Sequence, residues 1–255
     1  MTSGAAATLG ADPRLGYAAP AADLTWGQGV ATQATATFRE QYRCEHIPPH
    51  YQGWLHILFT FGIGGTALVW SALQVEQARP AEWLTIPLTF LYANVAEYWG
   101  HRGPMHHLKR GLRLVYERHT RQHHRFFTDD AMELDGLRDL RAVLFPPILM
   151  TFFITAFALP AGLLLAWVTT PNVAWLFVAT SLGYFLNYEF LHMSYHLPAG
   201  HPIARWPLID RLKRLHQAHH DPRLMASCNF NITYPICDAL FGTLHRQRRS
   251  PVRPR

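Results

Sequence analysis

Charged side chains are scarce in this sequence. They make up 16% of its 255 residues, against about 25% in an ordinary soluble domain, while hydrophobic residues make up 49%. The length allows a sizeable core, built either as one soluble domain or as one membrane bundle. Which of the two applies depends on where the few charges lie along the chain.

Cysteine is also rare, with three residues and no paired spacing, which excludes a disulfide framework and a thiolate zinc site. A secretory signal is missing as well, since no basic segment leads into an apolar run with a cleavage site. Residues 1–37 are instead rich in Ala, Thr, Gly and Pro. We predict a disordered tail over 1–37 and one membrane domain over 38–255.

Long apolar runs are present, and four of them are about long enough to cross a bilayer. They cover residues 54–73, 83–99, 143–168 and 173–191. Prolines interrupt 143–168 near its start and at Pro160, so this run is either one kinked span or a re-entrant pair. The predicted fold is all-α, an integral membrane bundle of about four transmembrane helices.

Positive charge lies in two blocks outside these runs. Of 23 Lys and Arg residues, nine lie in 101–141 and ten in 197–255, while the loop between the first two spans has only Arg79. With four spans, the positive-inside rule places both blocks and both termini on the cytoplasmic side. A net charge of +6 also fits a nucleic-acid binder, but no binding motif accompanies it, and contact with anionic headgroups is the simpler account.

Histidine is abundant, with sixteen residues in the chain, and ten of them form four groups. The groups are His101 with His106, His119 with His123 and His124, His192 with His196, and His216 with His219 and His220. The last two groups fit one face of an α-helix. His101 and His106 would diverge by about 140° on a straight α-helix, but Gly103-Pro104 allows one helix to end and another to begin between them.

All four groups fall at or beyond span ends on the predicted cytoplasmic side, so they can converge in a helical cap. One such pair is usually chance or a polar helix face, whereas four groups together predict a shared metal site. Ten nitrogen donors exceed the needs of one metal and suit two, which favours redox or oxygen chemistry over structural zinc. Glu97, Glu189 and Asp221 are either acceptors for the ring N–H groups or ordinary interfacial residues.

These groups and their surroundings resemble the fatty acid hydroxylase superfamily, also called the sterol desaturase family, over about residues 88–244. The resemblance rests on the histidine groups and four further segments: EYWGHR at 97–102, LFPP at 144–147, Asn229-Phe230 and CDALFGT at 237–243. One departure concerns His119, which is separated from His123-His124 by three residues where close fatty acid 2-hydroxylases have two. Thr120 occupies the position of their first histidine, so His119 is the least expected of the ligands unless a local helix distortion brings it round.

The resemblance implies a membrane-bound lipid hydroxylase or monooxygenase with a di-metal centre, usually taken as iron, with zinc possible on purification. Such enzymes use O2 and two electrons on an unactivated C–H bond of a fatty acyl or sterol-like lipid. Electrons would come from a separate donor of the cytochrome b5 or ferredoxin type. The implied metal ligands are His101, His106, His119, His123, His124, His192, His196, His216, His219 and His220.

Three alternatives stay open at this point. A desaturase can use the same site, and a relative that has lost activity can keep the fold. A non-enzymatic metal carrier is less favoured, because a transporter places its ligands near the midplane rather than at span ends. Aromatic residues of the spans line a substrate tunnel or serve in plain packing and lipid contact: Phe152, Phe153, Phe157, Phe177, Tyr184 and Phe185.

Overall fold

The computed structural model describes residues 33–246, and within this range helices are the only regular secondary structure. The all-α prediction is therefore confirmed for the described part of the chain. The predicted tail over 1–37 lies mostly outside it. Its last five residues differ from the prediction, because helix α1 (Gln33–His46) already begins at Gln33.

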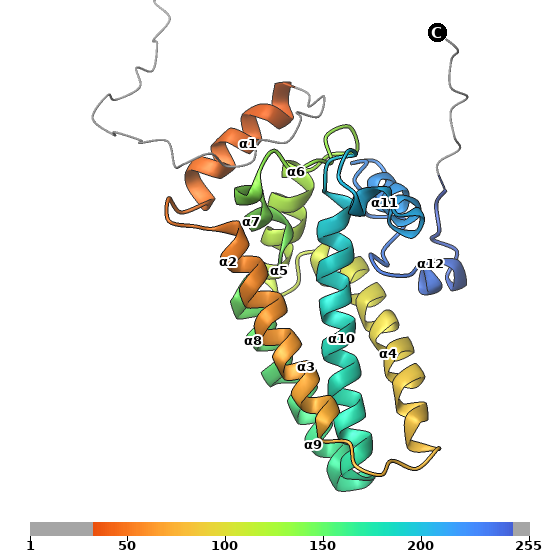
Figure 1. The fold of residues 1–255 in the computed structure, drawn as a ribbon. Coiled ribbons are helices and arrows are strands. Elements are labelled where there is room, and N and C mark those ends of the chain that lie inside the picture. The colour runs from red at the N-terminus through yellow and green to blue at the C-terminus, as the bar shows by residue number, and fades with distance from the viewer. Residues whose placement is uncertain (1–32, 247–255) are drawn as a thin grey trace, which may run out of the picture.

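Four helical rods pack side by side below a cap of shorter helices (Figure 1). The first rod is α2 (Gly53–Ile57), η1 (Leu58–Ile63) and α3 (Gly64–Leu73). The second is η2 (Glu82–Leu84), α4 (Thr85–Gly100) and η3 (His101–Met105). The third is α8 (Pro147–Phe153), η6 (Ile154–Ala158) and α9 (Leu159–Val168), and the fourth is α10 (Pro171–Tyr195). Residues 147–168 thus run in one direction, as a single span would, and not as a re-entrant pair.

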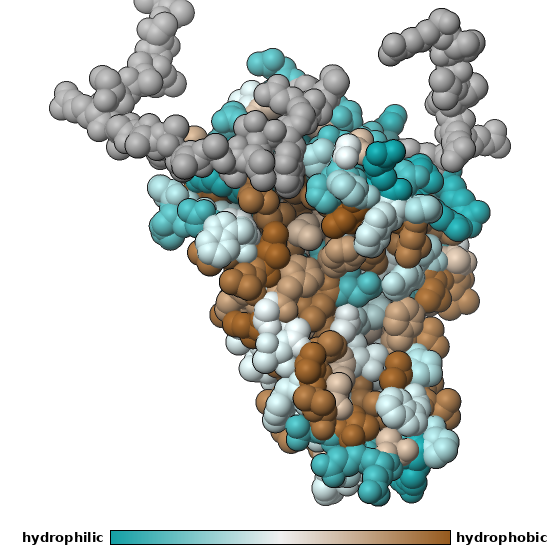
Figure 2. All heavy atoms as spheres, viewed as in Figure 1, coloured by the Kyte–Doolittle hydropathy of each residue, from teal (hydrophilic) through white to brown (hydrophobic). Residues whose placement is uncertain are grey.

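Two helical segments are long and apolar enough to cross a membrane, Gly53–Leu73 and Leu137–Val168. At 1.5 Å per residue, 21 residues cover the roughly 30 Å of a bilayer core. Large apolar side chains remain exposed along the rods, such as Leu88, Leu163 and Trp167. Figure 2 shows this apolar surface between a hydrophilic cap and a hydrophilic far end.

The far end of the bundle is closed by polar contacts between two connections. Thr170 caps α10 by accepting a hydrogen bond from the Val173 amide, and Pro171 occupies the first helical position. Glu82 accepts hydrogen bonds from the Thr170 hydroxyl at 2.6 Å and from the Asn172 side chain at 3.2 Å. These contacts join the second rod to the turn between the third and fourth.

Helix α10 lies centrally, packed against α3, α4 and α9 (Figure 1). Small residues let these helices approach closely. A Cβ on Gly64 would lie 2.7 Å from Leu186, and one on Gly162 would lie 2.8 Å from Val178. The close packing holds α10 firmly in the bundle. His192 and His196 lie at the C-terminal end of this helix.

Gly53 is the tightest of these contacts. A Cβ there would lie 2.0 Å from the backbone oxygen of Leu137, which cannot rotate away. We expect Gly53→Ala to lower the free energy of unfolding by about 1–3 kcal/mol, as overpacking does. Gly65 is the matched control, since nothing lies within 4 Å of its added Cβ. Thermal unfolding in detergent checks this, and equal midpoints for Gly53→Ala and Gly65→Ala would contradict the close contact.

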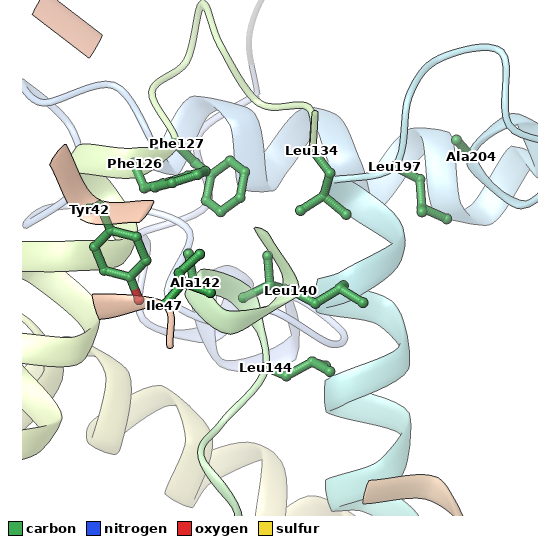
Figure 3. Close-up of a cluster of buried hydrophobic side chains, with 11 residues drawn as sticks. Tyr42, Ile47, Phe126, Phe127, Leu134, Leu140, Ala142, Leu144, Leu197 and Ala204 are labelled. Atoms are coloured by element: carbon green, nitrogen blue, oxygen red, sulfur yellow. The ribbon is translucent and has the colours of Figure 1, made fainter. Parts of the chain in front are cut away.

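The cap forms from α1, α5 (Arg113–Tyr116), η4 (Glu117–His123), α6 (His124–Phe126), η5 (Leu137–Asp139), α7 (Leu140–Val143), η7 (Ile203–Arg205), α11 (Pro207–His219) and α12 (Ile236–Leu240). Its core gathers side chains such as Tyr42, Phe126, Leu140 and Leu197 (Figure 3). Arg39 fastens α1 to this core by donating to the backbone oxygens of Phe126 and Ala131.

Candidate metal centre

A π-helical turn, η3, brings His101 and His106 together. In a π-helix the backbone bonds run from i to i+5, so residues five apart lie on one face. The two ring centroids are 4.9 Å apart with stacked planes, and the Nε2 atoms are 3.1 Å apart. The expected helix break at Gly103-Pro104 was wrong, because Pro104 lies inside the π-turn and the helix continues to Met105.

A second π-helical turn, η4, does the same for His119 and His124, also five residues apart. Their Nε2 atoms are 3.1 Å apart, and the Nε2 of His119 lies 2.8 Å from that of His101. This is the local distortion that His119 needed to join the other histidines. The extra residue before His123-His124 is taken up by the wider turn.

Ordinary α-helical spacing places the remaining groups. His192 and His196 follow one another at the top of α10, and His216, His219 and His220 end α11. The Nε2 of His216 lies 3.0 Å from that of His220 and 3.3 Å from that of His196. The C-terminal ends of α10 and α11 thus lie next to each other.

The ten imidazoles form two adjoining sets of potential ligands. Nine of them make two groups in which all ligand atoms lie within 4.8 Å of one another. The first group is His101, His106, His119, His124 and His219, and the second is His123, His196, His216 and His220. His192 stands beside the second group, with its Nε2 3.1 Å from that of His123. All ten are buried, whereas His107, the spare neighbour, is exposed.

Backbone carbonyls fix the orientation of five rings. The Nδ1 atoms of His101 and His219 pair with the oxygens of Phe230 and Cys228 at 2.5 and 2.8 Å. Those of His123, His196 and His220 pair with backbone oxygens at 2.6 to 2.9 Å. A carbonyl can only accept, so Nδ1 carries the proton and each Nε2 lone pair faces the cluster.

Carboxylates do not take this role. Glu97, Glu189 and Asp221 were open candidates as acceptors for ring N–H groups, but the structure gives each another partner. Glu97 accepts from the backbone and hydroxyl of Thr233, Glu189 from the Phe145 amide, and Asp221 from Arg223. A backbone carbonyl is a sufficient acceptor for the N–H of a neutral imidazole, so the rings need no buried carboxylate as their partner.

These residues fit bound metal cations. Nε2 lone pairs that face one another at about 3 Å cannot hydrogen-bond without a proton between them, and a cation at their centre satisfies them all. Protonation is opposed by burial, which lowers the pKa of His219 to about 4 and that of His123 to about 3. The Nδ1 atoms of His124 and His216 are buried without a partner.

Neutral burial predicts acid sensitivity of the metal-free chain. Below pH 6.5, the ordinary pKa of histidine, these imidazoles bind protons in the unfolded chain but not in the folded chain. The free energy of unfolding therefore falls as the pH falls. For His219 this continues to about pH 4. We expect a loss of ~1.4 kcal/mol per pH unit for each such imidazole. Thermal midpoints at pH 7.5 and 5.5 measure it. An unchanged midpoint would contradict neutral burial.

One further carboxylate, Asp238, holds the segment that follows α11, and sequence reasoning missed it. Asp238 is fully buried and accepts from the amides of Phe230 and Asn231 at 2.9 and 2.7 Å. It thereby positions the carbonyl that orients His101. Its only signal in the sequence is its place in the CDALFGT segment, whose role no spacing rule reveals.

Of the aromatic residues considered for a tunnel, one lines an open cavity between helices of the bundle. Tyr184 borders a space of about 430 Å³ between α3, α4 and α10. Phe152 and Phe157 are instead exposed on the outer face of the third rod. Phe153 and Phe185 stack on each other, with ring centroids 5.5 Å apart. These four side chains therefore do not line that cavity.

Comparisons with known proteins identify the family of this chain. The sequence model described as fatty acid hydroxylase matches residues 86–243. No curated protein matches significantly. A solved structure titled full-length Scs7p, with only the hydroxylase domain visible, is 19% identical with a TM-score of 0.48, over 75% of this chain and 64% of that one. The family match spans more than half of the sequence and includes all ten histidines. The chain therefore belongs to the fatty acid hydroxylase family.

Proposed function

We propose that this protein is a membrane-bound, O2-dependent di-iron enzyme that hydroxylates a C–H bond of a fatty acyl or sterol-like lipid, in lipid biosynthesis. The observation that carries the proposal is the convergence of ten buried, neutral imidazoles, nine of which form two adjoining ligand groups. Two irons bound there would supply activation of O2 and attack on an unactivated C–H bond.

The chain's own residues would then do three things. The imidazoles hold the metals through Nε2, with their orientation fixed by the carbonyls of Phe230, Cys228 and others. The buried setting of the ten rings excludes water from the reacting centre. The cavity below, bordered by Tyr184, offers an apolar place for a lipid chain.

We also propose the membrane arrangement. The four rods cross the bilayer, and the cap with its metal centre and both termini face the cytoplasm. Support comes from the apolar surface of the rods (Figure 2) and from the Lys and Arg residues of 101–141 and 197–255, the segments that build most of the cap. A separate cytochrome b5- or ferredoxin-type protein would deliver the electrons to this face, and no nucleic acid is expected as a partner.

Comparative lipid mass spectrometry tests the proposal. Cells expressing the intact chain are compared with cells expressing His219→Ala at equal levels, in several lipid backgrounds and with a reductant available. A lipid that gains one oxygen only with the intact chain supports the hydroxylase. A lipid that loses two hydrogens would instead identify a desaturase on the same site. No difference in any background would favour a metal-binding or inactive relative.

A further inference from the structure

A groove on the edge of the cap carries positive charge beside apolar side chains. It has a volume of about 390 Å³ and lies between α11 and the segment around α12. Arg211, Arg214 and Arg246 line it, while the rest of its wall is formed by leucines together with Tyr234 and Pro235. No acidic residue lines the groove. Such a surface is suited to an anion that has an apolar part.

Two of the three arginines lack a counter-ion within residues 33–246. Arg214 pairs with Asp210, four residues before it on α11. Arg211 and Arg246 contact no carboxylate in the described part of the chain. Their guanidinium groups therefore remain available to an anion that arrives from outside the chain.

An open cavity between α3, α4 and α10 adjoins this groove at Tyr234, which lines both. It has a volume of about 430 Å³, and its wall is apolar apart from Thr180, Tyr184, Asn187 and Tyr234. No charged side chain lines it. Trp83 stands at its far end, near the connection between the first two rods. Both volumes fall within the roughly 300–1,000 Å³ of ligand sites.

Tyr234 is the wall that the groove and the cavity share. Its ring lies against Phe90, with centroids 5.6 Å apart, and its backbone oxygen accepts from Asn94 at 2.9 Å. Tyr234 also packs against the buried cluster that contains Tyr188 and Leu191 of α10. The ring of Tyr188 is 5.7 Å from that of His192, so this buried cluster lies between the shared wall and the metal centre.

We propose that groove and cavity together bind one amphiphile with a single apolar chain and an anionic head group. Arg211 and Arg246 hold the carboxylate or phosphate of the head at the edge of the cap. The chain passes Tyr234 and lies in the cavity between α3, α4 and α10. This inference rests on the proposed function and narrows its substrate class to anionic single-chain lipids.

Equilibrium binding to the purified full-length protein in a non-ionic detergent tests the site. The probes are palmitate, hexadecanol, which has the same chain length without the charge, and inorganic phosphate, which has no chain. Phosphatidylglycerol serves as a two-chain anionic membrane lipid. We expect palmitate to bind most tightly, at least about tenfold more tightly than hexadecanol, since a charged hydrogen bond is worth that much.

Matched variants separate the two halves of the site. Arg211→Gln should weaken palmitate about tenfold and leave hexadecanol unchanged, whereas Arg110→Gln, an exposed arginine outside the groove, should change neither. Ala179→Leu fills the cavity and should weaken both lipids, while Ala166→Leu, on the exposed face of α9, should weaken neither.

Several outcomes would overturn the proposal. Equal palmitate affinity in Arg211→Gln and Arg110→Gln would contradict the head-group site. Equal palmitate affinity in Ala179→Leu and Ala166→Leu would contradict the chain site. Phosphatidylglycerol binding as tightly as palmitate would show that the arginines contact ordinary membrane lipid, and displacement by phosphate alone would show an anion site without a chain. Binding needs no turnover, so selective palmitate binding without lipid oxidation in cells would count against the proposed function alone.

Discussion

Replacing His216 by Ala is expected to leave the protein with one tightly bound metal in place of two. His216 belongs to the second ligand group, where its Nε2 lies within 3.3 Å of those of His196 and His220. Loss of partners that merely orient a ligand costs about 10–100-fold in metal affinity, so loss of the ligand should cost at least that. Metal analysis of the purified protein gives the stoichiometry directly.

His106→Ala is the counterpart in the first group. The Nε2 of His106 lies 3.1 Å from that of His101 and 3.0 Å from that of His219. Either variant should reduce lipid oxidation by at least about 100-fold, because the chemistry requires both metals. His107→Ala is the control, since this adjacent imidazole is exposed and should change neither metal content nor oxidation. Full metal content in His216→Ala and His106→Ala would contradict the two-group assignment.

Asp238→Ala is expected to have the largest effect on stability. The carboxylate is fully buried and accepts from two amides and from the hydroxyl of Thr243 at 2.7 Å. Removing it leaves these donors unpaired in a place that water does not reach. We expect a loss of about 3–5 kcal/mol in the free energy of unfolding. Metal content should fall as well, because the Phe230 carbonyl would no longer hold the ring of His101.

Asp210→Ala is the matched control for this carboxylate. Asp210 is exposed and pairs with Arg214 on the same helix, so its loss should cost less than about 1 kcal/mol. Asp238→Asn keeps one acceptor oxygen and should fall between the two. Thermal unfolding in detergent ranks the three variants. Equal midpoints for Asp238→Ala and Asp210→Ala would show that the buried carboxylate does not support the site.

Much of the site could be predicted because helix periodicity is a local property. The i, i+4 spacing of His192 with His196 and the spacing of His216, His219 and His220 place each set on one helix face before any tertiary contact forms. The four apolar runs likewise correspond to the four rods, since the length of a run follows from composition. The two π-helical turns, η3 and η4, could not be predicted in this way, because periodicity arguments assume an α-helix throughout.

The sequence by itself determined the helical fold, the family and the identity of the ten clustered histidines. Only the tertiary structure decided how they divide, with His123 in one group and its neighbour His124 in the other. It also decided that carbonyls rather than Glu97, Glu189 or Asp221 orient the rings. The sequence shows which side chains can bind a metal. Every residue has a backbone carbonyl, however, so only the folded structure shows which carbonyls accept from the imidazoles.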